Sequence, residues 1–179
     1  MIEIPFLAVE LAIALAWVIV RVVACVHAGR VDWRREAQLL FLYVCIAVIM
    51  RFTFFAFSKV DGHVQPLRFD PSRLWPIKCN IVPLVNLFHH DSVRDILINI
   101  PGNIAMFVPL GIALPFLFKE LDSCWKVTAC GAAFSLSIEV VQLLFFERAT
   151  DIDDLILNAL GCAIGYGVYR LFSRKPAAR

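Results

Sequence analysis

Three aspartates stand directly before an apolar segment near the C-terminal end of the chain. The stretch "ERATDIDDLILNALG" contains Asp151, Asp153 and Asp154, followed by Asn158. Thr150, three residues before Asp153, fits a capping box at the start of a helix. Capping uses only one or two carboxylates, so the cluster predicts a second role. That role is an ion pair with Arg148, a divalent-cation site, or a site for a cationic or phosphate-bearing ligand.

Glu139 is a second candidate for chemistry, because it lies inside an apolar run. A charge at bilayer depth costs about 2.5–3.5 kcal/mol, so such residues usually face protein or a wet cavity. Ser135 and Gln142 lie four residues before and three residues after Glu139, which places all three on one helix face. Hydrogen bonds between helices explain Ser135 and Gln142, whereas we assign Glu139 to function or to an essential ion pair.

Asparagines line the preceding apolar segment. In "ILINIPGNIAMFVPLGIALPF", Asn99 and Asn103 are four residues apart and share one helix face. Three prolines interrupt the same segment, so we expect that helix to be bent or broken and to form the wall of a polar cavity. Packing alone is an equally good explanation of this pattern.

The elements that carry these residues are membrane spans. The chain has 179 residues, of which 60% are hydrophobic and 18% are charged, and its mean hydropathy is +0.77. A span needs about 20 apolar residues as a helix. Five segments qualify: Pro5 to His27, Ala37 to Phe57, Ile96 to Phe118, Trp125 to Phe146 and Asp154 to Phe172. The prediction is an all-α, polytopic membrane helix bundle with one long loop between Ser58 and Asp95.

Basic residues near the span ends predict the orientation. They gather in the first loop, the third loop and the C-terminal tail, which the positive-inside rule assigns to the cytoplasm. The N-terminus, the long loop and the aspartates then lie outside. No Lys or Arg precedes Arg21, which itself interrupts the first apolar run, so we expect no cleaved signal peptide.

Other charged and small residues fit simpler explanations. Arg21 and Arg51 are expected to extend to an interface, and Glu10 lies about 16 Å from Arg21 along a helix, too far for direct pairing. Gly161 and Gly165 in "GCAIG" permit close helix packing. The net charge of +2 implies no nucleic-acid partner, and the cysteines lack metal-site spacing.

Taken together, these motifs resemble one family. The order "NIVPLVNLF", "NIPGNIAMFVPLGIALP", "SLSIEVVQLLF" and "ERATDIDDLILNALGCAIGY" is similar to the VanZ-like family of bacterial membrane proteins. The resemblance covers Asn80 to about Phe172. It departs from the family pattern at Leu84 and Ala149. It implies an added N-terminal helix and cytoplasmic loop over residues 1–36, followed by a four-helix VanZ-like domain over residues 37–175.

The resemblance implies a protein of the bacterial cytoplasmic membrane that binds or modulates an envelope lipid or a lipophilic glycopeptide, with a role in teicoplanin-type resistance or envelope stress. The expected ligand-binding residues are Asn80, Asn99, Asn103, Glu139, Gln142, Arg148, Asp151, Asp153, Asp154 and Asn158. The alternative is an intramembrane enzyme acting on a phosphate-bearing polyprenyl lipid, with Glu139 and Asp154 as catalytic candidates. Membrane lipid is the expected partner. We expect no cofactor and no metal, with a divalent cation at the aspartates as the alternative.

Overall fold

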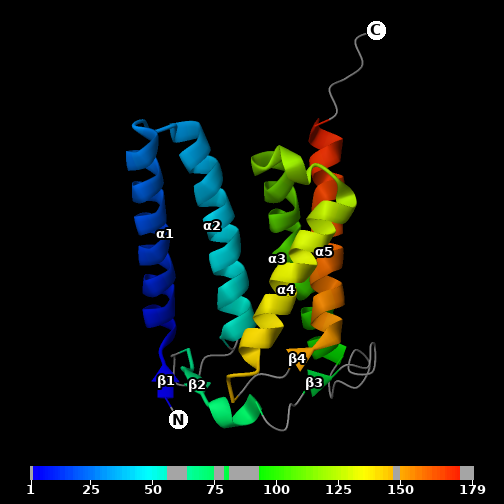
Figure 1. The fold of residues 1–179 in the computed structure, drawn as a ribbon. Helices are drawn as coiled ribbons and strands as arrows, with labels where there is room; N and C mark the ends of the chain where they lie inside the picture. The colour runs from blue at the N-terminus through cyan, green and yellow to red at the C-terminus, as the bar shows by residue number, and fades with distance from the viewer. Residues whose placement is uncertain (1, 56–63, 75–78, 81–92, 147–149, 174–179) are drawn as a thin grey trace. The chain divides into compact units, whose positions relative to one another are not determined.

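Five long helices make up most of the structure, a computed structural model that describes residues 2–55, 64–74, 79–80, 93–146 and 150–173. They are α1 (Phe6–Ala28), α2 (Trp33–Phe54), α3 (Val93–Leu117), α4 (Cys124–Gln142) and α5 (Ile152–Ser173) (Figure 1). Each contains a stretch long and apolar enough to cross a membrane. The prediction of an all-α, multi-pass membrane protein with five spans is confirmed.

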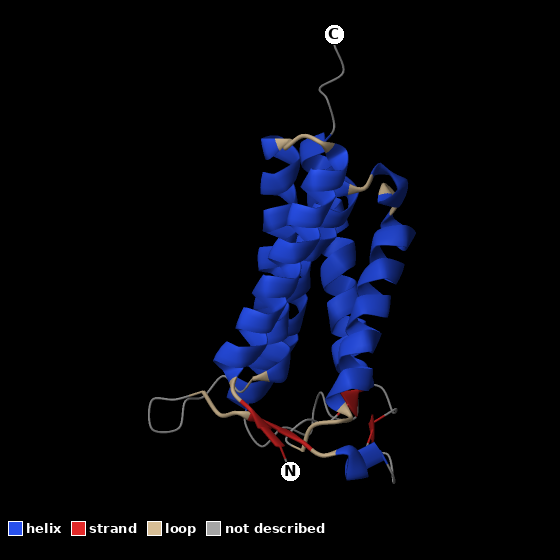
Figure 2. Cartoon of the chain, turned by 60° about the vertical axis from the view of Figure 1, so that its left-hand side comes forward, coloured by secondary structure: helices blue, strands red, loops and turns tan. Residues whose placement is uncertain are grey.

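The remaining regular elements are short. They are β1 (Ile2–Ile4), β2 (Leu67–Phe69), β3 (Cys79–Asn80), β4 (Thr150–Asp151) and two 3₁₀ turns, Pro71–Leu74 and Lys119–Leu121. Figure 2 shows how small the strands are beside the helices. β1 pairs antiparallel with β2, and β3 pairs parallel with β4. These pairs join segments that lie far apart in the sequence.

The start of α2 differs from the prediction. The helix begins at Trp33 instead of Ala37, because Asp32 caps it. The Asp32 carboxylate accepts the backbone N–H groups of Arg34 and Arg35 at 3.1 and 3.2 Å. Capping satisfies donors that a helix start otherwise leaves unpaired, so the polar residues after Asp32 join the helix.

The chain divides into two compact units, which we describe separately. Unit 1 comprises Met1–Ile77 and Gln142–Arg148. Its helices α1 and α2 run side by side in opposite directions, joined by a turn in which Gly29 takes a left-handed conformation with φ of 63°. Phe145 packs edge-on against Phe54 and Phe69, with ring centroids 5.8 and 6.1 Å apart.

The sequence suggested that Arg21 extends to a membrane interface. In unit 1 this side chain instead pairs with a residue of α2. Its guanidinium donates two hydrogen bonds to the carboxylate of Glu36 on α2, at 2.8 and 2.5 Å. Arg51 follows the expectation more closely, since it donates to the carbonyl of Phe55 just beyond the end of α2. Its guanidinium also lies 5.0 Å from the ring centroid of Phe6.

Unit 2 comprises Lys78–Val141 and Ala149–Arg179, and it contains α3, α4 and α5. Helices α3 and α5 approach closely through glycines. A Cβ added at Gly111, Gly161 or Gly165 would lie within 3.0 Å of backbone atoms of the facing helix. The prediction that the "GCAIG" segment serves packing is therefore confirmed.

The three prolines of α3 do not break it. Pro101, Pro109 and Pro115 all lie inside one helix that runs from Val93 to Leu117. Membrane helices tolerate proline where neighbouring helices or side chains satisfy the freed carbonyls. The segment was expected to be bent or broken, and the structure describes one unbroken helix through all three proline positions.

Candidate functional site

Polar side chains from α3, α4 and the start of α5 gather in unit 2 within an otherwise apolar bundle. We call this group the polar cluster, and it consists of Asn103, Ser135, Glu139, Asp151, Asp153, Asp154 and Asn158. All but Ser135 were predicted as ligand-binding residues. Ser135 had been assigned to interhelical packing, although its position four residues before Glu139 already placed it on the same face.

The structure places a cap of α5 at Asp151. Thr150 and Asp151 form β4, whose partners in β3 are Cys79 and Asn80. The helix therefore begins only at Ile152. The Asp151 carboxylate accepts the backbone N–H of Asp153 at 3.0 Å, which is the usual cap geometry. The side chain of Thr150, on which the predicted capping box depends, lies outside the described part of the structure.

Glu139 contacts the same turn from α4. Its side chain is 4% exposed, and Oε2 accepts the backbone N–H of Asp151 at 3.0 Å. The sequence had assigned Glu139 to function or to an essential ion pair, for which Arg148 is a nearby basic residue in the chain. Arg148 lies outside the described residues, and the contact that the structure describes is to a backbone amide beside the N-terminus of α5. A carboxylate is electrostatically favourable there.

Asp154 connects α5 to α3. Asn103 Nδ2 donates to Asp154 Oδ1 at 2.5 Å, although the two residues are 51 positions apart in the chain. Both side chains are partly buried. A hydrogen bond to an ionised carboxylate is shorter and stronger than one between neutral groups. Asn103, one of the two asparagines that the sequence singled out, therefore links α3 to the aspartates.

Asn158 forms the deepest contact of the cluster. Its Nδ2 donates to Ser135 Oγ at 2.9 Å, and the two residues are 2% and 0% exposed. Within the described part of the chain, Asn158 Oδ1 is buried and has no hydrogen-bond partner. Ser135 lies one turn before Glu139, and Asn158 lies one turn after Asp154, so the contacts between helices follow one another along the bundle.

Three other predicted residues, Asn80, Asn99 and Gln142, are not members of the polar cluster. The Asn80 backbone pairs with Asp151 across β3 and β4. Asn99 lies one turn before Asn103 on α3 and is exposed. Gln142 ends α4 within unit 1, where its Nε2 donates to the Thr53 carbonyl at 2.8 Å, so it serves the end of α2.

The carboxylates of the cluster are arranged for hydrogen bonding. Among the described residues, no three His, Cys, Asp or Glu side chains come together as metal ligands. Instead Asp151, Glu139 and Asp154 each accept an N–H group, and they do so around the first turn of α5. Such an arrangement places several carboxylates and one buried acid around the N-terminus of a single helix.

Comparison with known proteins adds two matches. The chain fits the sequence model of the VanZ/LLP1 family over residues 40–173, which includes all of the polar cluster and leaves out α1. Protein VanZ of Enterococcus faecium is 31% identical over 108 residues, which is 56% of this chain and 66% of that protein. The match thus spans just under two thirds of that relative. No solved structure matches the chain.

Proposed function

Because this chain belongs to the VanZ-like family of membrane proteins, we propose that it binds an envelope lipid or a lipophilic glycopeptide of the teicoplanin type at the outer leaflet of the bacterial cytoplasmic membrane. The family's association with teicoplanin resistance supports this ligand class. A polar head group would enter the cluster, and its lipid tail would remain in the bilayer.

The buried carboxylate of Glu139 is the observation that carries this proposal. The hydrogen bond between Asn158 and Ser135 joins two neutral groups, and helix packing needs no more than that. Glu139 adds an ionisable group that is 4% exposed inside a span, where a charge is expensive to keep. Its position beside the first turn of α5, where two further carboxylates lie, suits recognition of a polar or cationic ligand group.

The orientation of the spans supports the outer leaflet. Five spans place the turn between α1 and α2, the turn between α3 and α4, and the end of α5 on one side. Basic residues collect on that side: Arg30, Arg34, Arg35, Lys119, Lys126 and Arg170. The positive-inside rule makes it cytoplasmic. The aspartates at the opposite end then face outward, and so does the N-terminus.

The experiment compares Glu139→Gln and Asp154→Asn with the control Ser137→Ala. The amide variants keep the shape of the side chain and an oxygen acceptor but lose the charge. Ser137 lies on α4 outside the cluster, where it is exposed and donates only to a carbonyl of its own helix. We expect the wild-type protein to confer teicoplanin tolerance on a susceptible host, and both amide variants to fold and express but to lose that tolerance.

Binding is then measured directly with the full chain in nanodiscs. Thermal stability is recorded during titration with teicoplanin and, separately, with a polyprenyl phosphate. A shift in the wild type and in Ser137→Ala that is lost in Glu139→Gln supports the proposal. Full tolerance and an unchanged shift in Glu139→Gln would instead assign the residue to structure. Chemical conversion of the polyprenyl phosphate, followed by mass spectrometry, would replace the binding proposal with an enzymatic one.

A further inference from the structure

A groove runs along one side of α1 and α2 in unit 1, and it is independent of the function proposed for the polar cluster. Its volume is about 380 Å³. The lining residues are Trp17, Val18, Arg21, Val22, Trp33, Glu36, Ala37 and Leu40. Six of these eight side chains are apolar or aromatic, so the groove suits a hydrocarbon chain.

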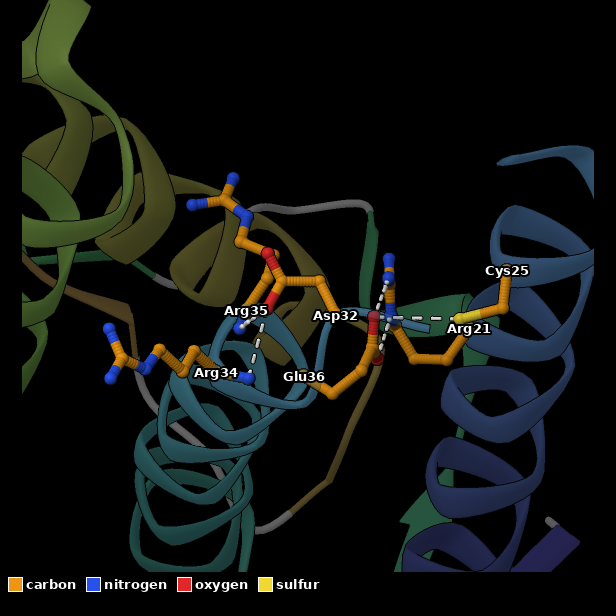
Figure 3. A network of polar contacts seen from close by, with 6 residues as sticks. All are labelled: Arg21, Cys25, Asp32, Arg34, Arg35 and Glu36. Carbon is orange, nitrogen blue, oxygen red and sulfur yellow. Dashed lines mark hydrogen bonds and ion pairs between the residues drawn. The ribbon is translucent and has the colours of Figure 1, made fainter. Parts of the chain in front are cut away.

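The two charged residues of the groove neutralise each other. Arg21 and Glu36 form a two-point contact, and the thiol of Cys25 lies 3.5 Å from the same carboxylate (Figure 3). Trp17 adds a ring contact with Tyr43 of α2, with centroids 5.3 Å apart. The groove wall is therefore held by specific contacts between the helices and presents no net charge to a ligand.

The mouth of the groove is positively charged. Trp33, the first residue of α2 and a lining residue, is 78% exposed. Arg30 and Arg34 beside it are also exposed. Asp32 is engaged as the helix cap, and Glu36 is engaged by Arg21. Figure 3 shows the Arg34 side chain extending away from the ion pair between Arg21 and Glu36.

These features match one kind of molecule. Exposed tryptophan marks the level of the lipid head groups, and arginine is suited to phosphate. Arg34 lies three residues before Ala37, so the two residues are neighbours on the surface of α2. Ala37 lines the groove. A hydrocarbon channel beside guanidinium groups that have no ion-pair partner among the described residues has the polarity of a phospholipid, with an acyl chain inside and a phosphate at the mouth.

We propose that the hairpin of α1 and α2 binds an anionic phospholipid of the cytoplasmic leaflet, with one acyl chain in the groove and the phosphate at Arg30 and Arg34. A zwitterionic lipid is disfavoured because it brings a second positive group to a turn that is already basic. Juxtamembrane basic residues attract anionic lipids by a factor of about five each. The site would anchor α1, which lies outside the region matched to the family.

The test measures which lipid contacts Trp33 in the full chain. The other three tryptophans are replaced by phenylalanine, and the protein is reconstituted in phosphatidylcholine bilayers. Brominated phosphatidylglycerol and brominated phosphatidylcholine are then compared as quenchers of Trp33 fluorescence at the same low mole fraction. We expect phosphatidylglycerol to quench more strongly in a saturable manner. The double variant Arg30→Gln/Arg34→Gln should reduce its relative affinity about tenfold or more.

Two further variants make the result specific. Lys126→Gln removes a basic residue from the start of α4 in unit 2, and it should leave the preference at Trp33 unchanged. Val22→Phe fills part of the groove without adding a second fluorophore, and it should weaken the preference. Equal quenching by both lipids in the parent protein would overturn the proposal. So would a preference that survives Arg30→Gln/Arg34→Gln, or quenching that depends on protein density because a second copy covers the groove.

Discussion

The glycine contact between α3 and α5 makes a sharp prediction about stability. A methyl group at Gly165 would fall within 3.0 Å of Val108 O and of Gly111 Cα, both of which are backbone atoms. No side chain can rotate away to relieve such a contact, so Gly165→Ala forces the two helices apart. Gly167 lies two residues further along the same helix, and a Cβ there meets nothing within 4 Å.

The comparison of these two positions isolates the packing cost. Alanine gains about 1 kcal/mol over glycine in a helix interior, and this gain applies to both variants. Overpacking costs about 1–3 kcal/mol and applies only to Gly165→Ala. The free energy of unfolding of Gly165→Ala should therefore lie about 1–3 kcal/mol below that of Gly167→Ala, whereas Gly167→Ala should equal or exceed the wild type.

The assay is unfolding by sodium dodecyl sulfate in mixed micelles, followed by circular dichroism. Gly161→Ala provides a second measurement, because its methyl group would meet the carbonyl of Ile104, the neighbour of Asn103. That variant should also weaken the Asn103–Asp154 contact and with it any activity of the polar cluster. Gly165→Ala and Gly167→Ala of equal stability would show that α3 and α5 do not pack through these glycines.

Three further outcomes are expected. Asp151→Ala should lower the free energy of unfolding by about 0.5–2 kcal/mol through loss of the α5 cap, and a smaller loss than in Asp153→Ala would contradict the assignment of Asp151 as the cap. A cysteine at Asp151 should be labelled by an impermeant reagent from outside intact cells and one at Arg170 only after permeabilisation; labelling of both from one side would exclude five spans. Arg21→Glu and Glu36→Arg should each make the chain more sensitive to protease, and the charge-swapped double variant should regain the protease resistance of the wild type. Equal resistance of all three variants and the wild type would show that the ion pair does not stabilise the hairpin.

The five spans were predictable because a membrane helix is specified locally, by a run of apolar residues of sufficient length. The starts of the helices were harder to predict from the sequence, since they depend on which polar residue caps the helix. Asp32 lies in "RVDWRRE", where the charge of Arg34 and Arg35 suggested a loop. Their backbone N–H groups, and not their side chains, decide that α2 begins at Trp33. At the start of α5, strand pairing with a segment far earlier in the chain includes Thr150 and Asp151, and the helix begins only at Ile152.

The membership of the polar cluster was largely predictable, whereas its pairings were not. Helix periodicity places Asn99 with Asn103 and Ser135 with Glu139, but it cannot say which asparagine meets Asp154. That choice depends on the rotation and height of α3 against α5, which the glycine contacts determine. Gln142 looked like a member for the same reason that Glu139 did, yet the last turn of α4 brings its amide to Thr53.

The ion pair between Arg21 and Glu36 has a consequence for biogenesis and for dissecting the protein. The family match begins at residue 40, inside α2, and a chain cut there keeps too little of that helix to span a bilayer, which takes about 20 residues. A chain cut between α1 and α2 keeps a full-length helix but leaves the Glu36 carboxylate without Arg21. We therefore expect the two helices to insert together as a hairpin, and a family domain that starts at residue 40 to be unstable without the helices before it.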